Sequence, residues 1–216
     1  MKTKLLAIIA WLFILSGSIF ATILLSWAIF PFIISPFSLE VASGLSASSI
    51  CRNMNQLMLY LLNPFNRHLV MSHFAVSHSG QHHFVAVKSL FILVEILFFG
   101  SMPAFIIYVK GYIKPGFAKI HRFFFIKMAI LPIFVAMLAI VIGFDTFFTL
   151  FHTILFIGDD TWLFNPVTDP IITVLPQPYF MLAFAIFCVL YEVVMWLLIV
   201  VIKYSKDLDT GNRKVV

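Results

Sequence analysis

The fold is decided first by residues 5–39, LLAIIAWLFILSGSIFATILLSWAIFPFIISPFSL, which contain no charged side chain. A helix needs about 20 apolar residues to cross a hydrocarbon core about 30 Å thick, because lipid cannot bond an unpaired backbone group. The stretch is too long for the apolar core of a cleavable signal peptide. We therefore expect an uncleaved anchor that crosses a membrane within it.

Three further stretches meet the same length test. Hydrophobic residues make up 62% and charged residues 11% of the 216, which excludes an ordinary soluble domain. The sequence predicts an all-α, polytopic membrane protein that forms a single integral membrane domain over residues 1–216. Four spans are predicted at about 5–34, 89–109, 123–145 and 179–202, with two long segments on one side at about 38–87 and 146–178.

The distribution of lysine and arginine predicts the orientation of these spans. Eleven of the fourteen precede the first span, lie around the turn between the second and third, or follow the fourth, and such residues are held on the cytoplasmic side. We expect both termini in the cytoplasm and the two long segments on the extracytoplasmic side. Topology and contact with anionic lipid account for the basic excess, so no nucleic-acid partner is expected.

Within segment 38–87, apolar residues recur at three- and four-residue steps from Ile50 to Leu62. The pattern predicts a short amphipathic helix that ends at Asn63-Pro64. Two interpretations remain open. The helix either caps the bundle or guides a lipid substrate.

Segment 146–178 continues from the third span. An apolar stripe at helical spacing, with His152 beside it, predicts a helical extension: Phe144, Phe147, Phe148, Phe151 and Leu155. Gly158 and the aspartates after it end the helix, and four prolines then favour an extended or looped return leg: Pro166, Pro170, Pro176 and Pro178.

Two carboxylates fall inside the predicted spans, where an ionised side chain is costly. For Glu95 a functional and a structural role are both open. For Glu192 we expect a structural hydrogen bond.

Histidine is concentrated before the second span. Five of the seven histidines lie between residues 68 and 83: His68, His73, His78, His82 and His83. Histidine-rich tracts bind metals nonspecifically, but no cysteine or carboxylate falls in this run and its spacing matches no closed site. We therefore expect no metal and no other cofactor. The alternative is acid–base chemistry, which two histidines from separate segments, such as His83 and His152, can divide between them.

Two passages carry the most specific patterns: SHSGQHHFVAVKSLF at residues 77–91 and FHTILFIGDDTWLFNPVTDPIITVLPQPYF at residues 151–180. Together they resemble the lipoprotein intramolecular transacylase family of Gram-positive bacteria. That family has a His-Met-x-Asp-Val-Lys pattern before the second span, and a second signature in which Phe-His precedes Asp-x-Trp-Leu-Phe, Asp-Pro, and then Pro and Phe.

Three residues of the first passage depart from the family pattern. Gly80 stands where a glutamate is common, Phe84 where methionine is usual and Ala86 where aspartate is usual. If one of those carboxylates orients the histidine, another group must do so in this chain.

The resemblance implies an acyltransferase that acts on lipoproteins whose N-terminal cysteine carries a diacylglyceryl group. The sn-2 acyl chain would move to the free α-amine and leave a lyso-form lipoprotein, at the extracytoplasmic face of the bacterial cell membrane and among its lipids. His83 and His152 would be the catalytic pair. The expected substrate-binding residues are Lys88, Asp160, Trp162 and Asp169.

Two other classes of function remain open from the residues alone. One is a metal-binding or transporter-accessory membrane protein that uses the histidine cluster, although Glu95 and Glu192 form no repeated pattern that would indicate a transport pathway. The other is a different outer-leaflet lipid acyltransferase or hydrolase. Bound metal would indicate the first, and a change in substrate mass the second.

Overall fold

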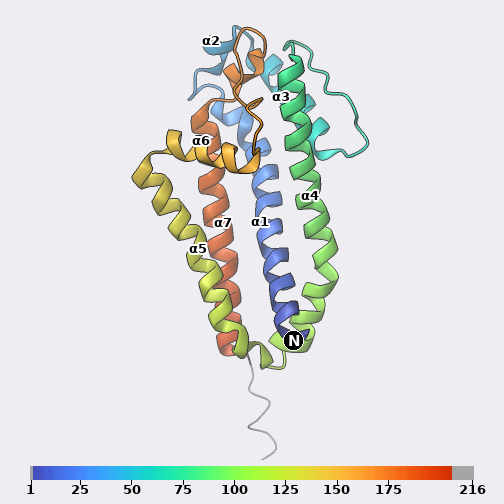
Figure 1. Cartoon of the computed structure of the whole chain (residues 1–216), viewed down its shortest axis with the longest axis vertical. Helices are drawn as coiled ribbons and strands as arrows, with labels where there is room; N and C mark the ends of the chain where they lie inside the picture. The colour runs from blue at the N-terminus through green and yellow to red at the C-terminus, as the bar shows by residue number, and fades with distance from the viewer. Residues whose placement is uncertain (1, 206–216) are drawn as a thin grey trace, which may run out of the picture. The chain divides into compact units, whose positions relative to one another are not determined.

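The computed structural model describes residues 2–205, and this part of the chain contains helices and their connections but no strand, as predicted. The α-helices, labelled in Figure 1, follow in chain order: α1 (Lys2–Ile33), α2 (Leu39–Ser43), α3 (Ala47–Leu62), α4 (His78–Tyr108), α5 (Arg122–Ile142), α6 (Phe144–Leu155) and α7 (Gln177–Tyr204). Three shorter helical turns join them: η1 (Val109–Ile113), η2 (Phe117–His121) and η3 (Pro170–Val174).

Four helical stretches are long and apolar enough to cross a membrane, and each overlaps one of the predicted spans: Thr3–Ile33, His78–Ile113, Phe117–Ile142 and Gln177–Tyr204. They leave large apolar side chains such as Leu5, Ile140 and Val201 uncovered by protein. A helix that is apolar on all sides is typical of a membrane span. The chain is therefore a multi-pass membrane protein.

Two helix boundaries differ from the expected ones. α4 begins at His78, well before the predicted span at residue 89, so the last three residues of the histidine run lie on helical turns and not in a loop. The third predicted span reaches residue 145, but α5 ends at Ile142 because Gly143 takes a left-handed φ of 80°. The helical extension is thus a separate helix, α6, which starts after this turn (Figure 1).

The described residues divide into two compact units that both draw on the long helices. The first unit comprises residues 2–20, 94–137 and 187–205, and the second comprises residues 21–93 and 138–186. Each unit has a buried apolar cluster of its own.

In the first unit, a tyrosine completes the backbone hydrogen bonding of a helix that contains proline. Pro132 lies inside α5 and has no N–H to donate to the carbonyl of Met128, four residues earlier. The Tyr191 hydroxyl donates to that carbonyl oxygen over 3.0 Å and accepts from Nε1 of Trp11 over 2.7 Å. Because lipid offers no alternative partner, this bond satisfies a group that would otherwise be unpaired.

The polar residue after Tyr191 also has a structural partner in the first unit. Nε1 of Trp196 donates to Oε2 of Glu192 over 2.9 Å, one helical turn away on α7. The structural hydrogen bond expected for this glutamate is therefore present.

The second unit is built around the buried face of α3. This face packs with side chains from α1, α4, η3 and α7, among them Phe30, Phe84, Ile171 and Tyr179. The amphipathic helix predicted from Ile50 to Leu62 is confirmed, with Asn63 as its C-cap. Because the apolar face lies in the protein's own core, the structure supports the interpretation of α3 as a cap of the bundle.

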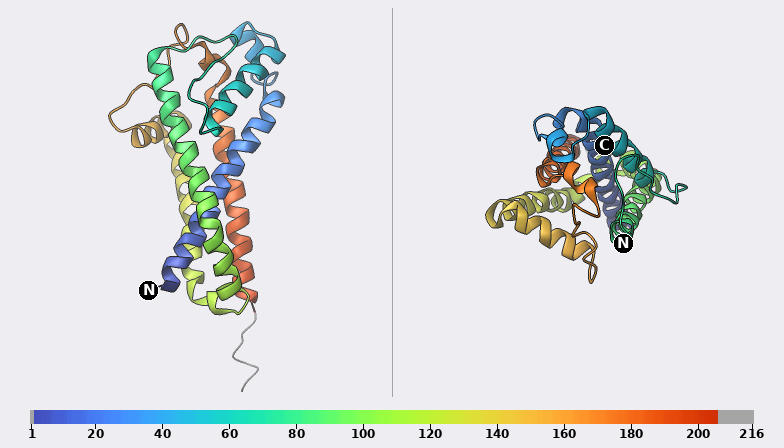
Figure 2. Two further views of the ribbon diagram at one scale, coloured as in Figure 1. Left: turned by 90° about the vertical axis from the view of Figure 1, so that its right-hand side faces the viewer. Right: turned by 90° about the horizontal axis from the view of Figure 1, so that it is seen from above.

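Polar residues of α3 hold the long connection to α4. The Asn53 side chain accepts from the N–H of His73 over 3.0 Å and donates to Nδ1 of the same residue over 2.9 Å. The Gln56 side chain accepts from the N–H of Ser72 over 2.9 Å. Residues 63–77 contain no helix and run as an extended loop, visible between α3 and α4 in Figure 2. His73 therefore has a structural role in this loop.

Candidate active site

The start of α4 is fixed by Ser77. Its Oγ accepts from the N–H of Gly80 over 2.9 Å, and its own N–H donates to Oδ1 of Asp169 over 2.8 Å. Serine is favoured at this position because its oxygen satisfies a backbone N–H that has no partner within the helix. This cap explains why α4 begins at His78 and carries His82 and His83 on its first two turns.

Asp169 lies against Gly80 with almost no space between them. The carboxylate is 3% exposed, and its second oxygen accepts from Oγ1 of Thr168 over 2.8 Å. A Cβ added to Gly80 would overlap Oδ1 of Asp169. Position 80, where the family resemblance would place a glutamate, therefore has no room for a side chain here. The hydrogen bonds of Asp169 run to Ser77 and Thr168 rather than to a histidine.

His83 is enclosed by aromatic rings. It is 6% exposed, and the rings of Phe156 and Phe164 stand edge-on to it with centroids 4.9 and 5.3 Å away. Its Nδ1 is buried, and within residues 2–205 it has no hydrogen-bond partner. A buried N–H without an acceptor is rarer than a buried lone pair without a donor, so we assign the proton to Nε2.

His152, on α6, is held in the opposite tautomer. Its Nδ1 lies 2.8 Å from the carbonyl oxygen of Phe148. A carbonyl can only accept, so Nδ1 carries the proton and Nε2 keeps a lone pair. Burial lowers the pKa of His152, while the hydrogen bond to Phe148 acts in the opposite direction. The ring is therefore neutral at neutral pH, and its Nε2 is able to accept a proton.

The two predicted catalytic histidines are neighbours in the second unit. Their ring centroids lie 6.2 Å apart, with 33° between the ring planes. Phe148 and Trp162 flank His152, with centroids 4.1 and 4.9 Å from its own. A neutral donor and a neutral acceptor side by side among aromatic rings form an arrangement suited to general acid–base catalysis.

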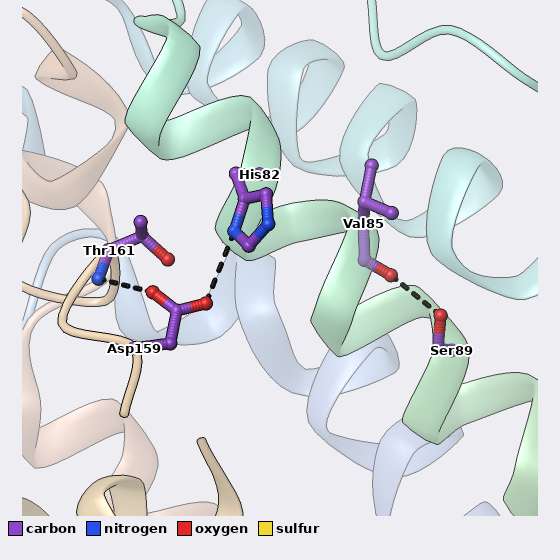
Figure 3. A network of polar contacts seen from close by, with 5 residues as sticks. All are labelled: His82, Val85, Ser89, Asp159 and Thr161. Atoms are coloured by element: carbon purple, nitrogen blue, oxygen red, sulfur yellow. Dashed lines mark hydrogen bonds and ion pairs between the residues drawn. The ribbon is translucent and has the colours of Figure 1, made fainter. Parts of the chain in front are cut away.

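A carboxylate that was not predicted as a site residue lies beside this pair. Oδ2 of Asp159 lies 3.1 Å from Nδ1 of His82, and a dashed line marks this contact in Figure 3. Oδ1 of Asp159 accepts from the N–H of Thr161 over 2.9 Å. The pKa of the Asp159 carboxyl lies below its usual value, first because the hydroxyl and the N–H of Thr161 lie beside the carboxylate, and further because His82 and His83 are near.

The four predicted substrate-binding residues occupy different positions. Of these, Trp162 contacts His152, and Asp169 caps α4. The buried Lys88 ammonium donates to the carbonyl of Asn66 and lies 4.3 Å from the centre of the Tyr60 ring, so it holds the α3–α4 connection. Asp160 is exposed, and its carbonyl accepts from the N–H of Leu163 in the turn that presents Trp162.

The remaining histidines of the run do not form a metal centre in the described part of the chain. His68 and His78 are exposed, and His73 is bonded to Asn53. Over residues 2–205, no three His, Cys, Asp or Glu side chains are placed to hold a metal ion.

Fold and site together define an integral membrane protein of four apolar helices, with two histidines side by side in an arrangement suited to acid–base catalysis. The family model of the lipoprotein intramolecular transacylase Lit matches residues 4–180. The chain belongs to this family, whose members are named for acting on lipoproteins as transacylases.

Solved structures of one relative agree with this assignment. The chain is similar to the membrane-integral lipoprotein intramolecular transacylase Lit from Bacillus cereus, at 26% identity and a TM-score of 0.80, over 94% of this chain and 95% of that one. Two structures of that protein in which a histidine is replaced by arginine or by alanine give 25% identity and TM-scores of 0.72 and 0.73. They cover 94% of this chain and 91% and 93% of theirs. No curated protein is significantly similar to the chain in sequence.

Sequence reasoning missed Asp159, Phe156 and Phe164 as site residues. The sequence pattern indicates for Asp159 only a part in ending the helix, and a contact with His82 leaves no spacing signal in the chain. The aromatic residues were not distinguishable from packing residues, because 26 of the 216 residues are phenylalanine.

Proposed function

We propose that the protein moves the sn-2 acyl chain of a diacylglyceryl-cysteine lipoprotein onto the α-amine of the same cysteine, which leaves a lyso-form lipoprotein. The observation that carries the proposal is the His83–His152 pair at 6.2 Å in a chain of this family. The site would face the extracytoplasmic side of a bacterial membrane, where its lipid-anchored substrate resides. The transfer exchanges an ester for an amide and needs no external energy source or cofactor.

His152 acts as the general base in this proposal. The α-amine has a pKa of about 8 and is substantially protonated at neutral pH, so it must lose a proton before it can attack. The Phe148 carbonyl holds the proton of His152 on Nδ1 and leaves the Nε2 lone pair available. The ammonium first releases one proton to water, and Nε2 then takes a second proton from the amine as its nitrogen attacks the ester carbonyl.

His83 supplies the hydrogen-bond donor. With its proton on Nε2, the ring donates to the oxyanion that forms at the ester carbon and then to the glyceryl oxygen that leaves. The bond from the carbonyl carbon to that oxygen breaks, the amide remains, and the proton taken from the amine balances the new hydroxyl. Attack closes a ring of about eight atoms within one molecule, so a site that folds the lipid gains part of the entropic advantage of proximity.

The aromatic residues favour transfer over hydrolysis. Phe148, Phe156, Phe164 and Trp162 surround the two histidines and leave little room for water beside the reacting ester. Trp162 contacts the substrate in this proposal, and the exposed Asp160 meets the polar part of the lipoprotein. Lys88 and Asp169 act on the site through the position of α4.

Mass spectrometry of a defined diacylglyceryl lipopeptide incubated with the purified protein tests the proposal. We expect unchanged total mass, with fragmentation that places one acyl chain on the cysteine nitrogen. The His83→Ala protein should not convert the lipopeptide, whereas His68→Ala, which changes an exposed histidine of the same unit, should convert it normally. Loss of one acyl mass would show a hydrolase, and normal conversion by His83→Ala would exclude the proposed pair.

A further inference from the structure

We propose that Asp159 is a positioning residue of this site. Paired with His82, it holds the segment from Phe156 to Phe164 against α4 and supplies negative charge beside the histidine pair while that pair carries an extra proton. The inference rests on the proposed function, because the extra proton arises when the pair deprotonates the substrate amine.

The positioning role follows from the two contacts that the carboxylate oxygens of Asp159 make. Oδ1 of Asp159 binds the N–H of Thr161 within its own segment, and Oδ2 reaches His82 on α4. Figure 3 shows Asp159 between these two residues. The segment so attached carries three rings that contact the catalytic histidines: Phe156, Trp162 and Phe164. Release of the carboxylate would therefore disturb the aromatic enclosure of both histidines.

The electrostatic part of the proposal follows from the charged and titratable side chains around the site. Facing this site are His82 and His83 from α4, His152 from α6, Asp160 from the same turn, and Asp169 before η3. The carboxylate of Asp169 accepts hydrogen bonds from Ser77 and Thr168, and Asp160 is exposed. Within residues 2–205, Asp159 is thus the carboxylate that pairs with a histidine of α4. Opposite charges attract, so the ionised Asp159 carboxylate stabilises an extra proton carried by the nearby histidine pair.

The structure also explains why this charge comes from a loop and not from α4 itself. Gly80, on the turn before His83, has no room for a side chain because Asp169 occupies that space. Ala86, on the turn after His83, carries no charge. A carboxylate near the pair must therefore reach α4 from another segment, and Asp159 does so through His82.

An Asp159→Asn variant separates charge from geometry. Asparagine keeps an oxygen for the N–H of Thr161 and an amide of similar size beside His82, so the segment stays attached while the charge is lost. We expect maximal turnover of the lipopeptide to fall about tenfold, and the acid limb of the pH–rate profile to move to lower pH by roughly one unit, since a tenfold change in proton affinity is one unit. Asp145→Asn, the same change at an exposed residue of α6, should behave like the wild type.

A second measurement does not depend on acyl transfer. Hydrogen exchange of backbone amides, followed by peptide mass spectrometry, reports whether the segment from Phe156 to Phe164 stays against α4. We expect its amides to exchange faster in Asp159→Ala, which lacks both carboxylate contacts, than in the wild type, and to be unchanged in Asp145→Ala, an exposed residue of α6. Equal exchange in Asp159→Ala and the wild type would show that the carboxylate does not hold the segment and would overturn the inference.

The outcomes separate the inference from the proposed function. Product formation by the wild type with an unshifted pH–rate profile in Asp159→Asn would overturn the inference alone, as would a loss of rate that is equal at every pH. Absence of N-acylated product with the wild type would remove the proposed function, and the catalytic role of Asp159 with it.

Discussion

The Nδ1–H of His152 donates to the carbonyl oxygen of Phe148 across one turn of α6, over 2.8 Å. This bond occupies the only proton of the neutral ring and leaves Nε2 as an acceptor. His83 has the reverse arrangement, because its Nδ1 is buried without a partner in the described part of the chain. The two rings therefore offer complementary nitrogens for proton transfer, and this asymmetry assigns their roles in the proposed reaction.

Replacement of His152 by alanine should abolish most of the activity while the protein still folds. General acid–base catalysis contributes about 10²- to 10⁴-fold, so turnover of the lipopeptide should fall by roughly that factor. The ring is only partly buried, so the unfolding temperature should change little. Turnover by His152→Ala within threefold of the wild type would contradict the assignment of this residue as the base.

The pH–rate profile should retain activity below the ordinary histidine range. Burial lowers the pKa of His152 from its ordinary value of 6.5, so the ring stays neutral as the pH falls through 6.5 and deprotonation of the amine remains possible. Once the titration of the substrate amine near pH 8 is divided out, the acid limb that remains for the wild type should thus have its midpoint below 6.5, and a midpoint above 6.5 would contradict the lowered pKa.

The same lowered pKa predicts how stability depends on pH. In the unfolded chain His152 gains a proton near its ordinary value of 6.5, before the folded ring does. The contribution of this group to folding is therefore fully present above pH 6.5 and declines as the pH falls below it. Thermal unfolding in detergent should show a smaller fall in unfolding temperature between pH 7.5 and 5.5 for His152→Ala than for the wild type. Identical falls would indicate that His152 titrates normally.

Gly80→Ala should destabilise the protein and lower its activity. The added methyl group would overlap the carboxylate of Asp169, which caps α4 through Ser77, and overpacking of this kind costs about 1–3 kcal/mol. Gly100→Ala is the matched control, because Gly100 is also in α4 and a Cβ there meets no atom within 4 Å. Thermal unfolding compares the two variants. Equal unfolding temperatures would show that the Gly80–Asp169 contact is not tight.

Tyr191→Phe should be less harmful when α5 no longer contains its proline. As a single substitution, Tyr191→Phe removes the hydroxyl that donates a hydrogen bond to the Met128 carbonyl. Loss of such a bond costs about 0.5–1.5 kcal/mol of folding free energy. In a Pro132→Ala background, the new N–H of residue 132 is able to donate a hydrogen bond to that carbonyl instead. Unfolding in detergent should give a smaller cost in the double variant. The same cost in both backgrounds would mean that the tyrosine does not compensate for the proline.

Much of the fold was predictable because its signals are local. Each span is a continuous apolar run in the sequence, and apolar residues of α3 recur at helical steps from Ile50 to Leu62. The early start of α4 was not predictable, because it depends on Asp169, a residue remote in sequence that bonds Ser77. The break before α6 depends on a single left-handed glycine, Gly143, inside an otherwise uniform apolar run.

The candidate site was predictable in part for the same reason. The two passages that carry the family resemblance identified His83 and His152, and the structure places their rings together. Spacing and composition could not predict how the two histidines divide their roles. They also could not predict that Lys88 lies against Tyr60 or that Asp159 contacts His82.

By itself, then, the sequence determined that this chain is a helical membrane protein, and it singled out His83 and His152 as candidate site residues, because hydrophobic length and specific residue patterns are properties of the chain alone. Only the tertiary structure decided which nitrogen of each histidine holds a proton and which carboxylate stands beside them. Those choices depend on hydrogen bonds and burial created by segments that are far apart in sequence, such as Asp159 on His82 and Phe156 on His83.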